Sequence, residues 1–277
     1  MEKHNGIKAK KSLGQNFLNN SNIPRAMADA ASIVPSDIIL EIGPGTGALT
    51  KELLLRSDRV IAIETDSRAI EVLNHVFAEE IQSGKLTLIS GDVRSCDLTM
   101  LGIHAGAYKL VANIPYYLSG FLFRTFLEHT VQPSTIVFLV QKEVAERIAR
   151  DKKESLLSLS VKAYGTPHYI QTVKKGNFTP QPKIDSAIIA ITGISKKRLN
   201  GVSEMAFFTL LHEGFKSRRK QLLGNLSTLY GREAVVRALT TLTLPLNVRA
   251  EDLPLAIWIS LAQHLEIPIE KTENTQS

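Results

Sequence analysis

Short apolar runs alternate with segments of helical periodicity between residues 38 and 165, and this alternation constrains the fold of the 277-residue chain most strongly. The runs cover residues 38–42, 60–63, 86–89, 109–112 and 135–140. They are rich in Leu and β-branched residues, as strands buried on both faces are. Between them, residues such as Ala69, Leu73 and Val76 follow helical spacing. We therefore expect an α/β fold with a mostly parallel sheet and helices on both faces.

The pattern changes after residue 165. Two strand-like runs, 168–173 and 185–191, flank a proline-containing loop and predict an antiparallel hairpin at one edge of the sheet. Residues 193–203 form a basic, polar linker, and the chain from residue 204 onward shows helical spacing without a strand signal. We therefore predict a first domain over residues 1–195 and a small all-helical domain over residues 203–268.

The composition excludes several classes of protein. No apolar run approaches the roughly 18 residues of a membrane-spanning helix. The single cysteine, Cys96, excludes an intrachain disulfide and a multi-thiolate metal site. We therefore expect a cytoplasmic protein that binds neither membrane nor metal.

The basic residues are clustered and the net charge is +6, which favours a polyanionic partner such as nucleic acid. A merely basic soluble protein is the alternative. The clusters are Lys8, Lys10 and Lys11; Lys174 and Lys175; Lys196, Lys197 and Arg198; and Lys216, Arg218, Arg219 and Lys220.

A glycine loop with acidic partners follows the first apolar run. Gly43, Gly45 and a third glycine lead into a helix expected from about residue 48, and such a turn lets a ligand approach the backbone closely. Glu64 ends the next run, where a carboxylate can bind ribose hydroxyls. The spacing formally fits a dinucleotide fingerprint, so NAD remains an alternative, as does a turn without ligand. Glu41, just before the first glycine, favours the cationic S-adenosylmethionine.

Asp92 follows the third run and is expected at the carboxyl edge of the sheet, where ligands bind in open α/β folds. Its carboxylate could accept a hydrogen bond from the amino group of the cofactor's adenine. It could equally cap the following helix, which is a common role for Asp.

The fourth run ends in Asn113-Ile-Pro115-Tyr116-Tyr117, a set of residues suited to an exocyclic adenine amine. The Asn113 side-chain oxygen and the carbonyl near Pro115 can accept hydrogen bonds from such an amine, and proline stiffens the turn. Tyr116 offers a flat face on which a base can stack, worth about 1–3 kcal/mol. This chemistry depends on positioning and electrostatics. The alternative is a strand-to-helix turn whose tyrosines belong to the core.

These residues resemble the rRNA adenine N6,N6-dimethyltransferases, whose bacterial KsgA-type members act on small-subunit rRNA. The similarity extends over about residues 8–265. It is carried by Asn113-Ile-Pro-Tyr and by Lys11-Ser-Leu-Gly-Gln15-Asn16-Phe17-Leu18, residues 41–50, Gln141-Lys-Glu-Val-Ala-Glu-Arg147, and Phe178-x-Pro180-x-Pro182-Lys183-Ile-Asp185-Ser186-Ala187.

The resemblance implies a Rossmann-like class I methyltransferase with a mostly parallel seven-stranded sheet and a small C-terminal helical domain. It assigns a role to each of nine residues. The cofactor would contact Asn16, Leu18, Gly43, Glu64, Asp92 and Asn113, and the target adenine would meet Asn113, Pro115, Tyr116 and Phe178. By itself, Phe178 would be interpreted as a core aromatic residue beside two prolines.

The implied activity is dimethylation of two adjacent adenosines in a 3′-terminal hairpin loop of 16S rRNA. S-adenosylmethionine would be the methyl donor and the immature 30S particle the partner, with the protein acting as a monomer. Two alternatives remain: a large-subunit rRNA methyltransferase that confers macrolide resistance, and a non-catalytic RNA-binding assembly factor.

Overall fold

The computed structural model describes residue 7, residues 9–10, 13–217 and 219–265. The chain divides into two compact units, which are described separately below. The first comprises residues 1–149 and 165–195, and the second comprises residues 150–164 and 196–277.

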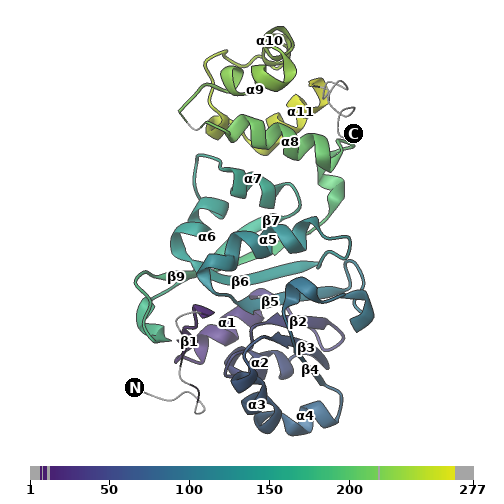
Figure 1. Cartoon of the computed structure of the whole chain (residues 1–277), viewed down its shortest axis with the longest axis vertical. Coiled ribbons are helices and arrows are strands. Elements are labelled where there is room, and N and C mark those ends of the chain that lie inside the picture. The colour runs from purple at the N-terminus through teal and green to yellow at the C-terminus, as the bar shows by residue number, and fades with distance from the viewer. Residues whose placement is uncertain (1–6, 8, 11–12, 218, 266–277) are drawn as a thin grey trace, which may run out of the picture. The chain divides into compact units, whose positions relative to one another are not determined.

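A seven-stranded sheet forms the centre of the first unit (Figure 1). The strand order is β4-β3-β2-β5-β6-β9-β7; the first five strands are mutually parallel, and β9 runs antiparallel to both β6 and β7. This confirms the predicted fold class, including the antiparallel hairpin. The bounds are β2 (Ile38–Ile42), β3 (Arg59–Glu64), β4 (Leu86–Ser90), β5 (Tyr108–Asn113), β6 (Thr135–Gln141), β7 (Thr166–Val173) and β9 (Ser186–Thr192).

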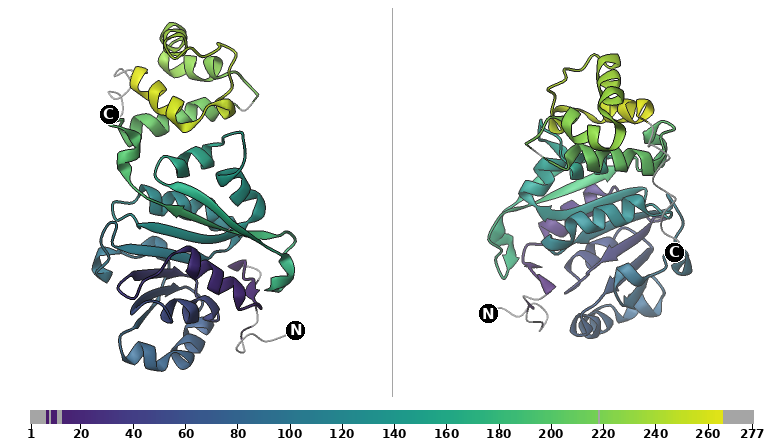
Figure 2. Two further views of the ribbon diagram at one scale, coloured as in Figure 1. Left: turned by 180° about the vertical axis from the view of Figure 1, so that it is seen from behind. Right: turned by 45° about the horizontal axis from the view of Figure 1, so that its top comes forward.

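Side chains that alternate along the strands pack against helices on both faces of the sheet. Ile39 and Val137 belong to one apolar cluster with residues of α1 (Asn22–Ala30), α2 (Ala48–Leu54) and α3 (Ser67–Val76). Seen from behind in Figure 2, α1 crosses in front of the strands. Phe138 points to the opposite face, where its ring lies 5.0 Å from that of Phe123 on α5 (Ser119–Glu128). Strand order reverses beside β2, and this places a crevice at the carboxyl ends of β2 and β5.

Two very short strands form a second ladder that no periodicity in the sequence predicted. β1 (Phe17–Leu18) pairs antiparallel with β8 (Phe178–Thr179), so that Leu18 lies opposite Phe178 and Phe17 lies opposite Thr179. The ladder joins segments about 160 residues apart in the sequence. It brings the N-terminal motif beside the proline-containing loop.

The remaining elements of the first unit are short. They are α4 (Ala78–Gln82), α6 (Lys142–Ala149), and the 3-10 helices η2 (Val93–Ser95), η3 (Thr99–Leu101), η4 (Tyr116–Leu118) and η5 (Lys175–Asn177).

The described residues of the second unit form helices and connecting loops without a strand, as predicted for the C-terminal part. Its helices are α7 (Leu156–Lys162), α8 (Glu204–Phe215), α9 (Leu222–Tyr230), α10 (Arg232–Thr241) and α11 (Leu255–His264), with 3-10 helices η6 (Lys196–Leu199) and η7 (Ala250–Asp252). Trp258 is fully buried and stacks on Phe215 at a centroid distance of 5.5 Å.

Residues 150–164 group with this second unit, whereas the predicted boundary placed them in the first domain. The physical reason is a set of contacts close to α7. The Glu154 N–H donates to the Glu251 carbonyl at 2.7 Å, and Lys153 pairs with the Glu251 carboxylate. Ser155 caps α7 through a reciprocal bond with Ser158. Such contacts between distant segments leave no periodic signal in the sequence.

Candidate functional site

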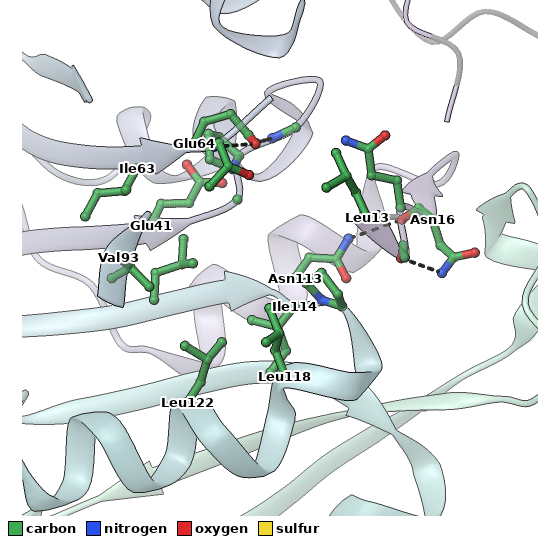
Figure 3. A pocket seen from close by; sticks show the side chains of 18 of the residues that line it. Leu13, Asn16, Glu41, Ile63, Glu64, Val93, Asn113, Ile114, Leu118 and Leu122 are labelled. Atoms are coloured by element: carbon green, nitrogen blue, oxygen red, sulfur yellow. Dashed lines mark hydrogen bonds between the residues drawn. The ribbon is translucent and has the colours of Figure 1, made fainter. Parts of the chain in front are cut away.

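A cavity of about 360 Å³ opens at the carboxyl edge of the sheet (Figure 3). All nine residues to which the resemblance assigns a role line it: Asn16, Leu18, Gly43, Glu64, Asp92, Asn113, Pro115, Tyr116 and Phe178. They come from six segments. Four of these end or follow the parallel strands β2, β3, β4 and β5, which deliver their carboxyl ends to the same edge. The other two contain β1 and β8, which pair with each other.

The glycine loop between β2 and α2 forms one wall of this cavity. Gly43 has a φ of +66° and donates its N–H to the Ile63 carbonyl at 2.9 Å, which ties the loop to β3. Gly47 has a φ of +84°, and a Cβ there would lie 2.5 Å from a ring carbon of Phe77. The turn therefore requires glycine on both conformational and steric grounds.

The carboxylate of Glu64 connects the glycine loop to the turn after β3. Its Oε2 accepts from Gly45 N–H at 3.0 Å, and its Oε1 accepts from the N–H groups of Thr65 and Asp66 at 2.8 and 2.9 Å. These three bonds fix the carboxylate at the cavity wall. A carboxylate accepts about four hydrogen bonds, so capacity remains for a ribose hydroxyl.

Glu41 is the least satisfied polar group in the cavity. Its side chain is 1 % exposed, and neither carboxyl oxygen has a hydrogen-bond partner among the described residues. Burial raises the pKa of this carboxyl to about 8, and the nearby Glu64 carboxylate adds to the effect. The Thr50 hydroxyl lies close enough to lower the pKa in part, although it too lies outside hydrogen-bonding geometry. A buried carboxyl without a partner favours a cationic ligand group beside it.

Asp92 caps η2 and also lines the cavity, so both roles considered for it are structurally possible. Its Oδ1 accepts from the Arg94 N–H at 2.9 Å, and its carboxylate forms an ion pair with the Arg94 guanidinium. This guanidinium holds the pKa of the Asp92 carboxyl below its usual value. Arg94 gave no signal in the sequence, and it competes with any ligand amine for the same oxygens.

Asn113 ends β5 and faces the N-terminal segment. Figure 3 shows its amide directed toward Asn16, to whose carbonyl oxygen the Nδ2 group donates at 3.5 Å. Among the described residues, no donor bonds to the Asn113 Oδ1. The Pro115 carbonyl accepts from the Leu118 N–H at 2.9 Å within η4, so this predicted acceptor already serves the turn. The Asn113 oxygen is the more available acceptor.

Two aromatic residues contribute to the cavity from different elements. Tyr116 begins η4, and its hydroxyl lies 2.7 Å from the Ser186 Oγ on β9. Phe178, on β8, is 3 % exposed and belongs to the main apolar cluster while also lining the cavity. The core role considered for Phe178 and the base-stacking role are therefore not mutually exclusive.

Some lysines of the basic clusters already form ion pairs with acidic side chains, which makes them less available to a polyanion. Lys174, Lys196 and Lys216 pair with Asp185, Glu204 and Glu213, at 3.0, 3.0 and 3.2 Å respectively. Lys8, Lys11 and Arg218, which belonged to the predicted clusters, lie outside the described residues. Within the described part of the chain, no group of three or more His, Cys, Asp or Glu side chains could hold a metal ion. None of its helices is long and apolar enough to cross a membrane.

Comparisons with known proteins identify the family of the chain. The family model described as Ribosomal RNA adenine dimethylase matches residues 6–266. Ribosomal RNA small subunit methyltransferase A of Dehalococcoides mccartyi is 39% identical over 259 residues, covering 92% of this chain and 88% of that protein. The protein of the same name from Lactiplantibacillus plantarum is 34% identical, covering 94% and 91%.

Solved structures show the same fold. A dimethyladenosine transferase from Plasmodium falciparum aligns with a TM-score of 0.73 and 26% identity, covering 88% of this chain and 95% of that one. The 23S rRNA methyltransferase ErmE aligns with the same TM-score at 22% identity, covering 90% and 99%. At that identity, the second likeness concerns the fold alone.

Proposed function

The chain belongs to the ribosomal RNA adenine dimethylase family, and from this premise we propose that it dimethylates N6 of two adjacent adenosines in a 3′-terminal hairpin loop of 16S rRNA. S-adenosylmethionine would donate the methyl groups. The substrate would be the immature 30S particle, and the protein would act in the cytoplasm as a monomer. The second unit would help to hold the RNA.

The observation that carries this proposal is the convergence of two sets of residues on one cavity. Gly43, Glu64 and Asp92 line it together with Tyr116 and Phe178. The first set suits a nucleoside cofactor, and the second suits a flat base. Asn113 lines the same cavity, as its proposed double role requires.

S-adenosylmethionine fits the polar groups of the cavity. Its ammonium and sulfonium would place positive charge near Glu41, whose buried carboxyl has no described partner. Ribose hydroxyls would donate to Glu64, which three backbone N–H groups already orient. The adenine amino group would donate to Asp92. A cationic group beside Glu41 would stabilise the ionised form of this buried carboxyl, whereas a pyrophosphate there would oppose its ionisation, and this favours S-adenosylmethionine over NAD.

When bound, S-adenosylmethionine supplies an electrophilic methyl group. The protein's part is to position the acceptor nitrogen. Asn113 Oδ1 would accept an N6–H of the target adenine, which favours a nitrogen lone pair localised toward the methyl group. Tyr116 and Phe178 would hold the ring between them, and Pro115 would stiffen the turn. The proton displaced from the amine would pass to water.

The test is methyl transfer to defined ribosomal substrates. Immature 30S particles and 23S rRNA would each be incubated with the protein and radiolabelled S-adenosylmethionine, followed by mass spectrometry of the digested RNA. We expect N6,N6-dimethyladenosine in 16S rRNA. Labelling of 23S rRNA alone would identify a large-subunit enzyme, and binding without labelling would identify an assembly factor; either result contradicts the proposal.

A pair of asparagine variants tests the site itself. Asn113→Ala should lower the labelling rate on the order of 100-fold, because a positioned acceptor is lost. Asn74→Ala, at an exposed position on α3, is the matched control and should leave the rate unchanged. An undiminished rate in Asn113→Ala would show that the acceptor has been wrongly assigned.

A further inference from the structure

Tyr116 is held at both of its ends. Its carbonyl oxygen accepts from the Ser119 Oγ at 2.9 Å, at the start of α5. Its hydroxyl lies 2.7 Å from the Ser186 Oγ, and no other partner of this hydroxyl is recorded among the described residues. A ring fixed at the backbone and at the para position has little freedom to rotate or tilt.

Ser186 is a rigid point of attachment. It is the first residue of β9, is completely buried, and lies opposite Gln141 of β6 and Val173 of β7. The preceding residue is fixed as well, because the Lys142 N–H donates to the Asp185 carbonyl at 3.0 Å. Ser186 therefore cannot follow the tyrosine if the ring moves.

Ser186 does not line the cavity, whereas Tyr116 does. The bond ties the tyrosine hydroxyl to β9, and the ring links this bond to the cavity that Tyr116 lines. Any effect of Ser186 on a base bound there must consequently pass through the orientation of that ring.

We propose that Ser186 is a positioning residue for the target adenine, which it aligns by fixing the plane of the Tyr116 ring. The inference rests on the proposed function, because it assumes that an adenine stacks on Tyr116. It adds a residue outside the cavity to the machinery of methyl transfer. The hydroxyl of Tyr116 then serves as an anchor for the ring and takes no part in proton transfer.

A double-mutant cycle separates this role from a merely structural one. Tyr116→Phe keeps the ring and removes the anchor, while Ser186→Ala removes the other partner. Each single variant should lower kcat/KM for immature 30S particles about two- to tenfold, the range expected for one neutral hydrogen bond. The kcat/KM of the double variant should be no lower than that of the more impaired single variant, because both changes break the same bond.

Two further measurements distinguish positioning from general damage. The Kd for S-adenosylhomocysteine, measured by calorimetry, should stay within twofold of wild type in all three variants. Ser57→Ala is the matched control: Ser57 is also fully buried and bonded to backbone carbonyls, and it does not line the cavity. It should lower Tm without changing kcat/KM.

The outcomes are distinguishable. Losses that multiply in the double variant would overturn the inference, as would a cofactor Kd that weakens in parallel with kcat/KM in Ser186→Ala. In both cases the proposed function would stand, provided that wild-type protein labels 16S rRNA. Wild-type protein that labels no rRNA would overturn the proposed function and this inference together.

Discussion

Glu41→Gln should remove a pH-dependent cost to stability that is built into the cavity. The Glu41 carboxyl is 1 % exposed and its pKa is raised from 4.5 to about 8. Between these two values the unfolded chain releases a proton that the folded chain keeps. The contribution of Glu41 to the free energy of unfolding must therefore fall as pH rises through this window, by about 1.4 kcal/mol per pH unit.

From pH 5.5 to 7.5 this amounts to about 2–3 kcal/mol for the cofactor-free protein. Below pH 4.5 both states are protonated, and above pH 8 both are ionised, so the contribution is constant outside the window. Glutamine cannot ionise. The variant should therefore gain stability relative to wild type by about 2–3 kcal/mol over the same pH range, since the other titrating groups are common to both proteins.

Urea denaturation at pH 5.5, 6.5 and 7.5 without cofactor measures this difference directly. Glu79→Gln, at an exposed position on α4, is the control and should follow the wild-type dependence. The reasoning is refuted if the difference between wild type and Glu41→Gln stays constant over this pH range. A constant difference would mean that the Glu41 carboxyl ionises alike in the folded and unfolded chains.

Three further predictions concern other residues of the chain. The pKa of Asp66 is lowered to about 2, chiefly by its hydrogen bond with Arg68, so the ionised carboxylate stabilises the fold above pH 4 and this contribution is lost as pH falls toward 2. Asp66→Asn should lower the free energy of unfolding by about 2 kcal/mol at pH 7. In acid titrations of unfolding, this difference from wild type should disappear near pH 2. Gly47→Ala should lower stability by about 1–3 kcal/mol in urea melts because its Cβ would collide with Phe77, and wild-type stability would contradict this. Reversing the charges of Arg218, Arg219 and Lys220 should flatten the salt dependence of rRNA binding while sparing cofactor affinity; an unchanged slope would show that they do not contact phosphate.

Local patterns in the sequence predicted the sheet and much of the cavity. Glu64, Asp92 and Asn113 each lie within three residues after an apolar run, and parallel strands must bring such residues to one edge. The prediction therefore needed only the strand pattern. Their roles toward cofactor and base remain predictions.

Contacts between distant segments could not be predicted from local patterns in the sequence. The bond between Tyr116 and Ser186 and the pairing of Leu18 with Phe178 join residues 70 and 160 positions apart. Neither contact produces a periodic signal, and a two-residue strand is too short to show one. Arg94 was overlooked for another reason: a lone arginine beside an aspartate is common, and only the geometry shows that it occupies the carboxylate.

The order in which the chain is synthesised determines when the β1–β8 ladder can form. β1 leaves the ribosome early, yet its partner residues Phe178 and Thr179 follow only after five parallel strands have been made. β9, which covers the edge of β6, comes later still. A nascent chain that ends after β6 thus has its glycine loop, an unpaired N-terminal segment and an open sheet edge. The cavity is completed, and that edge is protected from other chains, only when residues 178–192 have been synthesised.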